Sequence, residues 1–261
     1  MQLRSRLSKA VSIATIAGVC SVLPVGARAD SAVDADAQAV LGKMSKYLGS
    51  LPRFSVTYAA VDEVVTAEGQ KLQFLHSGEI TAQRPDRLFV VRKGAAGTSQ
   101  VFLGGGKLTL FAQNAGAYLQ LPAPSIDAAI GAVHKLGFDA PGADFLDSKP
   151  LDGSTMDMVS GTHVGMTFLD GVEVHQLAFR GAEVDWQLWV TAGDKPLPLR
   201  YVVTTKSVGG APQYTLQLRN WNTAPKVEAA RFAFVPPRAA RQLDPAAVTV
   251  NAIGDMTLRK E

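Results

Sequence analysis

Short segments rich in β-branched and aromatic residues recur along most of this chain, and turn residues separate them. Six such segments precede residue 122 and five more follow residue 160. Most connections within each group are only a few residues long, so neighbouring strands are predicted to pair antiparallel. The predicted strands are 54–65, 71–82, 87–93, 99–103, 107–111, 117–121, 161–169, 172–180, 183–190, 197–206 and 213–221.

Two helical patterns accompany the strands. Apolar residues spaced by three and four from Val33 to Leu48 predict a helix, capped by Ser31 or Asp30 and ended by Gly49 and Pro52. A second helix is predicted over 126–136, capped by Ser125, with a short helical turn over 141–146. No composition shift marks a linker between the two strand groups, so residues 30–261 are predicted to form one α+β domain. Its expected architecture is one large, curved antiparallel sheet of about eleven strands, a half-barrel with helices on the concave face.

The amino-terminal segment has the pattern of a secretory leader. Residues 1–9 carry three basic residues and no acid, residues 10–25 are uncharged, and Ala27 and Ala29 are the small residues that signal peptidase accepts. Cleavage is predicted after Ala29, which places the mature protein in the periplasm. The apolar run is shorter than the roughly 20 residues that span a bilayer, and no later stretch is long enough. A lipoprotein signal at Cys20 is an alternative, although the residue sizes at Ala17 and Val19 are the reverse of that motif.

Removal of this leader changes the electrostatic argument. The full chain has 26 basic and 23 acidic side chains, a formal charge of +3. The leader takes away four basic residues and no acid, which leaves 22 basic against 23 acidic side chains, a net charge of −1. The basic surplus that would favour nucleic acid is therefore absent from the predicted mature chain. Its only cysteine, Cys20, is absent as well.

The sequence lacks the common motifs of catalytic and metal-binding sites. The glycine run at 104–106 precedes Lys107, but the spacing of a phosphate-binding loop is missing, which favours a hairpin turn. His76, His134, His163 and His175 are too far apart in sequence to form a helix-borne metal pair. No Gly-x-Ser-x-Gly elbow is present. The sequence therefore predicts no enzyme, no cofactor and no metal.

Two tryptophans lie on opposite faces of one predicted strand. Alternation places Trp186 and Leu188 on one face and Trp189 on the other. Two interpretations are open. Trp186 could belong to the core while Trp189 packs under a loop or helix, or part of this aromatic surface could line a cavity for an apolar ligand.

Two sets of motifs resemble known families. The strand before Arg84-Pro85, the strand after it, and the 104–111 hairpin are similar to LolA-like periplasmic lipoprotein carriers, although Gly105 and Phe111 replace the usual aspartate and tyrosine. The segments 70–74, 84–88, 184–189, 195–198 and 232–237 resemble a bacterial family of predicted periplasmic proteins, domain of unknown function 2092. The LolA-like resemblance implies a half-barrel whose apolar concavity accepts acyl chains or the lipid of a partner.

The expected function is binding without catalysis. The leading hypothesis is a periplasmic carrier or sensor that takes a lipid, an acyl chain or a lipoprotein into the half-barrel. Strand alternation gives cavity candidates, although each could instead be sealed core: Leu72, Phe74, Leu88, Val90, Leu108, Leu110, Trp186 and Leu188. The alternative is an envelope module that binds a protein partner through exposed aromatic surface near Trp189 and Trp221. A hydrolase with an unrecognised site ranks third.

Overall fold

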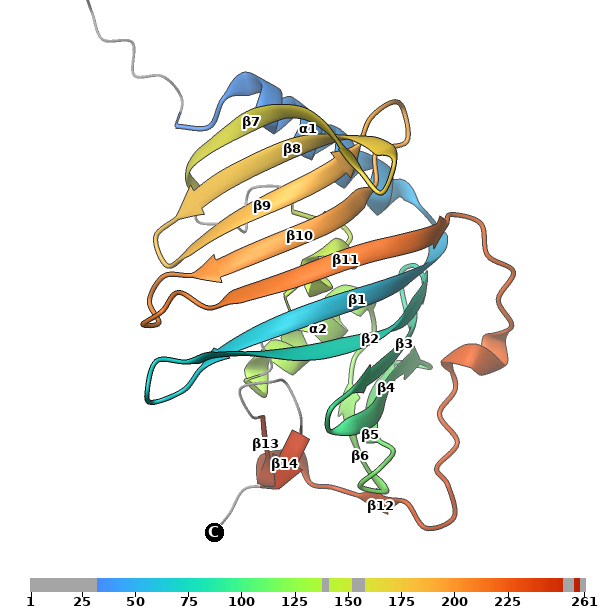
Figure 1. The fold of residues 1–261 in the computed structure, drawn as a ribbon. Helices are drawn as coiled ribbons and strands as arrows, with labels where there is room; N and C mark the ends of the chain where they lie inside the picture. Colours follow the sequence, from blue (N-terminus) through green and yellow to red (C-terminus); the bar gives the residue numbers. More distant parts are fainter. Residues whose placement is uncertain (1–31, 138–140, 152–157, 251–255, 259–261) are drawn as a thin grey trace, which may run out of the picture.

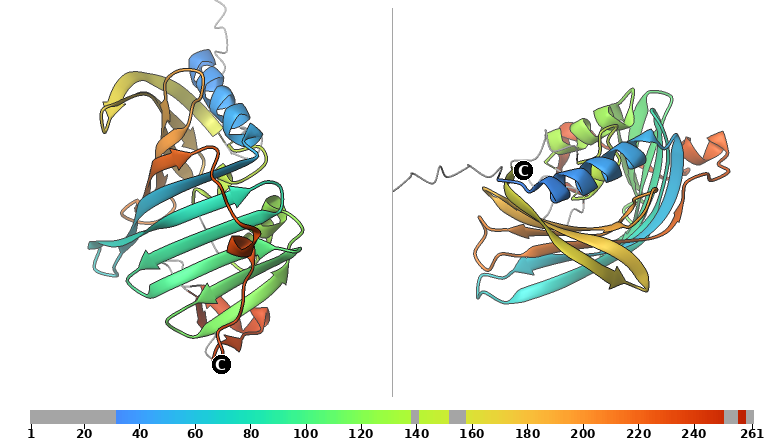
Figure 2. Two further views of the ribbon diagram at one scale, coloured as in Figure 1. Left: turned by 90° about the vertical axis from the view of Figure 1, so that its right-hand side faces the viewer. Right: turned by 90° about the horizontal axis from the view of Figure 1, so that it is seen from above.

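A strongly curved sheet wraps around two α-helices in this protein (Figure 1). The computed structural model describes residues 32–137, 141–151, 158–250 and 256–258. The predicted cleavage site after Ala29 and the charged tip at 259–261 lie outside these residues. Both helices lie on the concave side of the sheet (Figure 2). The α+β half-barrel that the strand pattern predicts is therefore confirmed.

The eleven long strands begin and end close to the predicted positions, because glycine, proline and polar turn residues bound each one. The first group is β1 (Arg53–Val65), β2 (Lys71–Gln83), β3 (Arg87–Gly94), β4 (Gly97–Gly104), β5 (Lys107–Ala112) and β6 (Ala117–Pro122). The second group is β7 (Met158–Leu169), β8 (Val172–Gly181), β9 (Val184–Thr191), β10 (Pro198–Thr205) and β11 (Gln213–Asn222).

One pairing joins the two groups into a single sheet. Strand β1 pairs with β2 on one side and with β11 on the other, where Tyr58 is opposite Leu218. The order is β12-β6-β5-β4-β3-β2-β1-β11-β10-β9-β8-β7. Among the described strands of this sheet, all pairs are antiparallel except that of β12 (Arg241–Gln242) with β6, which makes the sheet mixed. A separate pair is formed by β13 (Val248–Val250) and β14 (Met256–Leu258), after the 3-10 turn η3 (Pro245–Ala247).

Helix α1 (Ala35–Ser50) covers one end of the concave face, as Figure 2 shows from above. The structure places its N-cap at Asp34, later than the predicted Ser31 or Asp30, because Asp34 Oδ1 accepts a hydrogen bond from the amide of Ala37 at 2.6 Å. The other carboxylate oxygen accepts from Thr162 Oγ1 at 2.8 Å and from the amide of His163 at 2.9 Å. Asp34 therefore caps α1 and ties it to β7.

Large aromatic side chains fill the concavity beneath β8, β9 and β10. Phe179 and Trp186 stack with ring centroids 4.0 Å apart, and Trp186 meets Tyr201 edge to face at 6.0 Å. Phe145, in the short turn η1 (Ala143–Phe145), contacts Tyr201 at 5.4 Å. Each of these four residues is at most 3% exposed. This end of the half-barrel is a sealed core.

The segment at 232–237 forms no strand, although its apolar residues alternate as in one. It follows the turn η2 (Ala229–Phe232) and crosses the outer face of the sheet (Figure 2). The ring of Phe234 lies 5.3 Å from Phe102, 5.3 Å from Phe111 and 5.0 Å from Tyr118. Alternation shows which side chains of this segment are buried, but the partner is a sheet face instead of a sheet edge. The apolar outer face of β4 to β6 is thereby covered.

Candidate functional site

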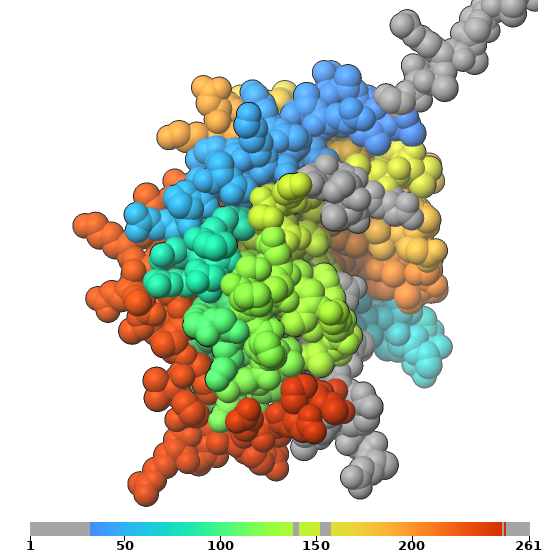
Figure 3. Space-filling model, turned by 180° about the vertical axis from the view of Figure 1, so that it is seen from behind, coloured from blue at the N-terminus to red at the C-terminus, as the bar shows by residue number. Residues whose placement is uncertain are grey.

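A cavity of about 370 Å³ separates helix α2 (Ile126–Lys135) from the concave face of β1 to β5. Figure 3 shows α1 and α2 covering this side of the molecule. Ser125 Oγ caps α2 by accepting from the amide of Ala128 at 3.1 Å, as predicted. The amide of Ile126 donates to the carbonyl oxygen of Pro85 at 2.8 Å, which fixes the start of α2 to the turn between β2 and β3. The helix is thus held across the sheet.

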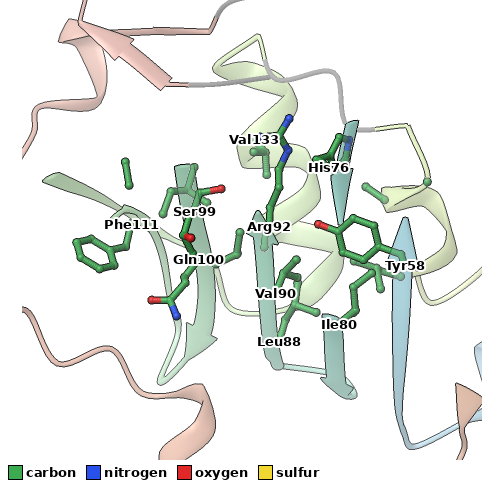
Figure 4. Close-up of a pocket in the computed structure, with 18 of the residues that line it drawn as sticks. Tyr58, His76, Ile80, Leu88, Val90, Arg92, Ser99, Gln100, Phe111 and Val133 are labelled. Carbon is green, nitrogen blue, oxygen red and sulfur yellow. The ribbon is translucent and has the colours of Figure 1, made fainter. Parts of the chain in front are cut away.

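Apolar side chains at alternate positions of β3 and β5 form one wall of the cavity. Leu88 and Val90 of β3 and Leu108 and Leu110 of β5 are two residues apart, so each pair projects from the same face. Small and medium-sized side chains of α2 form the opposite wall, namely Ala129, Ile130 and Val133. The two walls enclose a largely apolar space (Figure 4).

The predicted site residues divide into three groups. Leu88, Val90, Leu108 and Leu110 line the cavity. Leu72 and Phe74 lie on the correct face of β2, but near its outer end, and they are not among the described lining residues; Leu72 is 38% exposed. Trp186 and Leu188 are 2% and 0% exposed and belong to the sealed core of the other end.

The surroundings of Trp186 and Trp189 show whether these side chains pack in the core or line the cavity. Neither Trp186 nor Trp189 is among the described residues of this cavity. Trp186 packs in the core and also borders a separate depression of about 340 Å³. Trp189 is half-buried, with the guanidinium of Arg200 5.6 Å from its ring centroid. Of the two interpretations, the first holds for Trp186, while Trp189 packs against an arginine instead of a loop or helix.

A polar cluster closes one side of the cavity, and the sequence motifs did not identify it. It consists of Tyr58, Asp62, His76, Arg92 and Tyr214. His76 Nε2 lies 3.2 Å from Asp62 Oδ2, and Arg92 Nη2 lies 4.0 Å from the same oxygen. Figure 4 shows Tyr58, His76 and Arg92 on the same side of the cavity, away from Phe111.

The polar cluster continues the same rows of side chains as the apolar wall. Asp62 follows Val56 and Ala60 at even positions of β1, and Arg92 follows Leu88 and Val90 in β3. Alternation could therefore have placed these charges on the concave face. What it could not show is that strands β11, β1, β2 and β3, adjacent in the sheet, bring all five side chains together.

Gly78 of β2 makes room for one of these side chains. It is opposite Tyr58 on one side and Arg92 on the other. Because it has no side chain, the ring of Tyr58 can lie across β2, and its hydroxyl donates to the carbonyl oxygen of Val91 in β3 at 3.2 Å. A Cβ atom at Gly78 would collide with that carbonyl oxygen and crowd the ring of Tyr58.

Burial keeps the tyrosine hydroxyls of the cluster uncharged. It raises the pKa of Tyr58 to about 12, against a smaller opposing effect of Arg92. Burial also raises the pKa of Tyr214 far above its ordinary value, and the nearby carboxylate of Asp62 adds to this effect. Both phenols are therefore neutral hydrogen-bonding groups throughout the physiological pH range.

A second group of charges holds the loop after α2 at the edge of the cavity. Arg84 Nη1 donates to the carbonyl oxygen of Leu146, which lines the cavity. Asp127 of α2 accepts from Ser148, at 3.0 Å from its amide and 2.7 Å from its hydroxyl. Burial raises the pKa of Asp147 to about 6, and neighbouring Asp127 contributes to the increase.

Comparison with protein families gives an assignment. A family model described as "Predicted periplasmic protein (DUF2092)" matches residues 37–244. The chain belongs to this family. The resemblance that its sequence motifs indicate is therefore confirmed. None of the curated proteins matches the chain.

Solved structures similar to this member of the family have low sequence identity. An uncharacterized conserved protein from Thermus thermophilus is 13% identical, with a TM-score of 0.50, over 80% of this chain and 98% of its own. LprF from Mycobacterium bovis is 15% identical, with a TM-score of 0.47, over 79% and 98%. A LolA superfamily protein from Nitrosomonas europaea is 12% identical, with a TM-score of 0.38, over 76% and 97%. The similarity to the Thermus protein shows a shared fold.

Two further features are absent from the described residues. No helix among them is both long and apolar enough to cross a membrane. They also contain no group of three or more His, Cys, Asp or Glu side chains arranged to hold a metal ion.

Proposed function

We propose that this protein is a non-catalytic periplasmic carrier or sensor that binds one apolar chain between α2 and the sheet. The observation that carries the proposal is the largely apolar cavity of about 370 Å³, walled by Leu88, Val90, Leu108 and Leu110. Ligand pockets usually measure about 300–1,000 Å³ and are mainly apolar with a few polar groups. The cavity is at the lower end of that range, which favours one acyl chain over a lipid with several chains.

The proposed location rests on the leader and on the family. Cleavage after Ala29 would release the mature protein into the periplasm, which agrees with the description of its family. Amino-terminal sequencing of protein purified from the native envelope tests this part. A mature chain that begins at Asp30 is expected, and an intact Met1 would contradict it.

Binding can be tested with two tryptophan variants of α2. Val133 lines the cavity and Lys135 is exposed on the same helix. Native mass spectrometry of periplasmic wild-type protein should show a co-purifying lipid, and the fluorescence of N-phenyl-1-naphthylamine should rise on binding. Val133→Trp should abolish both signals by filling the cavity, whereas Lys135→Trp should preserve them. A lipid-free wild-type protein that also fails to bind the dye would refute the proposal.

A second candidate function is an envelope interaction module, and the edge strand β7 favours it. This strand ends the sheet, and its alternate residues Val164, Met166 and Phe168 are 56%, 46% and 71% exposed. An edge strand with exposed apolar side chains is suited to pairing with an extended segment of another protein. The surface near Trp221 is less suitable than expected, because its Nε1 donates to the carbonyl oxygen of Pro198 at 3.0 Å and its ring contacts Phe54.

Photo-crosslinking in the native envelope tests this second function. A photoreactive amino acid at position 168, on β7, should capture one defined protein partner. The same amino acid at position 57 provides the control, because Thr57 is exposed on the central strand β1. Equal capture at both positions, or capture at neither, would count against a partner on β7.

A further inference from the structure

The polar cluster at the cavity needs an explanation beyond the binding of an apolar chain. Five polar side chains, two of them oppositely charged, come from four adjacent strands and border a space whose other walls are mainly apolar. Burying such groups costs free energy unless each finds a partner. An occupant made only of hydrocarbon would add to this cost, because it would exclude water from the cluster. The arrangement fits an occupant with a polar head.

His76 indicates what this head must offer. Its side chain is only 9% exposed, and its Nε2 lies 3.2 Å from Asp62 Oδ2. An Nε2–H that donates to Asp62 leaves Nδ1 as a hydrogen-bond acceptor in the neutral ring. Nδ1 is buried and has no hydrogen-bond partner in the part of the chain that the structure describes. A hydroxyl group can donate to such an atom, while a carboxylate or a quaternary ammonium cannot.

The charges of the cluster argue against a charged head. Asp62 already faces both His76 and Arg92, so its carboxylate is balanced within the protein. A further negative charge beside Tyr214 would meet the burial and the Asp62 carboxylate that raise the pKa of that tyrosine, and the opposing effect of Arg92 on that pKa is smaller. A further positive charge would meet the guanidinium of Arg92. An uncharged head avoids both penalties.

The tyrosines offer the complementary groups. The hydroxyl of Tyr58 donates to the carbonyl oxygen of Val91, so its oxygen can still accept a hydrogen bond. Tyr214 borders the same space and its ring lies 6.4 Å from that of His76. Ser99 adds a further neutral polar side chain on β4 (Figure 4).

We propose that the occupant is a single-chain amphiphile whose uncharged head carries at least one hydroxyl group, with the head beside Tyr58, His76 and Tyr214 and the chain against Leu88, Val90 and Leu110. This inference rests on the proposed binding function and adds the class of ligand and its orientation. Monoacylglycerols and fatty alcohols have this chemistry. Free fatty acids and cationic surfactants do not.

The test compares three probes with the same sixteen-carbon chain length and different heads: 1-monopalmitoylglycerol, palmitate and hexadecyltrimethylammonium. Each probe competes with N-phenyl-1-naphthylamine, which is uncharged, for wild-type protein freed of lipid. Monopalmitoylglycerol should bind about tenfold tighter than either charged probe, the effect expected from one or two hydrogen bonds. Equal binding of the three probes, or tighter binding of a charged one, would overturn the inference while leaving the carrier function in place.

Three substitutions locate the effect. His76→Phe and Tyr214→Phe remove polar atoms and keep an aromatic ring at each position, so each should reduce the preference for monopalmitoylglycerol several-fold while the affinity for the dye persists. Tyr118→Phe is the matched control, because Tyr118 packs against Phe234 on the outer face. An unchanged preference in both cavity variants would refute the assigned orientation. If wild-type protein binds neither the dye nor any of the three probes, the carrier function itself fails, and the inference fails with it.

Discussion

The concave faces of β1–β6 and β7–β11 are both built from apolar side chains, yet they are filled in different ways. Beneath β8–β10, the rings of Phe179 and Trp186 stack, Tyr201 packs edge to face on Trp186, and the result is a sealed core. Beneath β3 and β5, leucine and valine side chains line a cavity between the sheet and α2. The difference shows that side-chain size, more than hydrophobicity, decides which end of this half-barrel contains a cavity.

The largest effect expected from this comparison is at Trp186. Trp186→Ala should lower the free energy of unfolding by about 3–5 kcal/mol, because it leaves a hole in a sealed core. Leu110→Ala, beside the existing cavity, should cost about 2 kcal/mol, the low end for a buried leucine, since fewer contacts are lost. Urea denaturation measures both. Equal losses at the two positions would mean that the two ends are packed alike.

A smaller effect on stability is expected on the outer face of β4 to β6. Phe234→Ala removes a half-buried ring that contacts Phe102, Phe111 and Tyr118, and should lower the free energy of unfolding by about 1–2 kcal/mol. Binding of N-phenyl-1-naphthylamine should persist, because Phe234 is not among the described residues that line the cavity. Val235→Ala is the control, since Val235 is 81% exposed and should have almost no effect. Loss of dye binding in a folded Phe234→Ala protein would show that the outer covering also shapes the cavity.

Helix α1 covers the end of the concave face that contains the sealed core, and its N-cap gives a third test. Asp34→Ala should lower the free energy of unfolding by about 1 kcal/mol, because the amide of Ala37 loses its partner and the bonds to β7 are lost. Asp36→Ala is the matched control in the first turn of the same helix. Comparable stability changes in the two variants, measured by urea denaturation, would remove the assigned role of Asp34.

The smallest expected effect is on the pH dependence of stability, and it concerns the loop after α2 at the edge of the cavity. The pKa of Asp147 is about 6 in the folded protein and near 3.8 in an unfolded chain. The folded state therefore binds more protons between these values, so the contribution of Asp147 to stability is present below pH 3.8 and is lost as the pH rises through 6. Asp147→Asn should remove this loss and be the more stable protein at pH 7.5. Parallel pH dependences of unfolding in the two proteins would contradict the assignment.

Strand positions could be predicted from the sequence because local residues determine them. The residues that line the cavity could not all be predicted, because lining also depends on how far each residue lies from the covering helix. Leu72 and Phe74 project from the same face as His76, but the hairpin of β1 and β2 extends beyond the cavity, so they do not reach it. Periodicity identifies the face of a strand and not its distance from a covering helix. The packing partner of Phe234 could not be predicted from the sequence either, because alternation does not distinguish pairing at a sheet edge from packing on a sheet face.

The pairing of β1 with β11 has a consequence for the order in which the protein is completed. Thr57 is opposite Arg219, so the middle of the sheet joins residues from nearly opposite ends of the described chain. Tyr214 and Leu216 of β11 also border the cavity. A chain emerging amino-terminus first therefore lacks the β11 side of the cavity until its last long strand arrives, and such distant pairing is slow to form. The proposed binding site is thus among the last parts of the molecule to be completed, and a chain that ends before β11 would lack one of its walls.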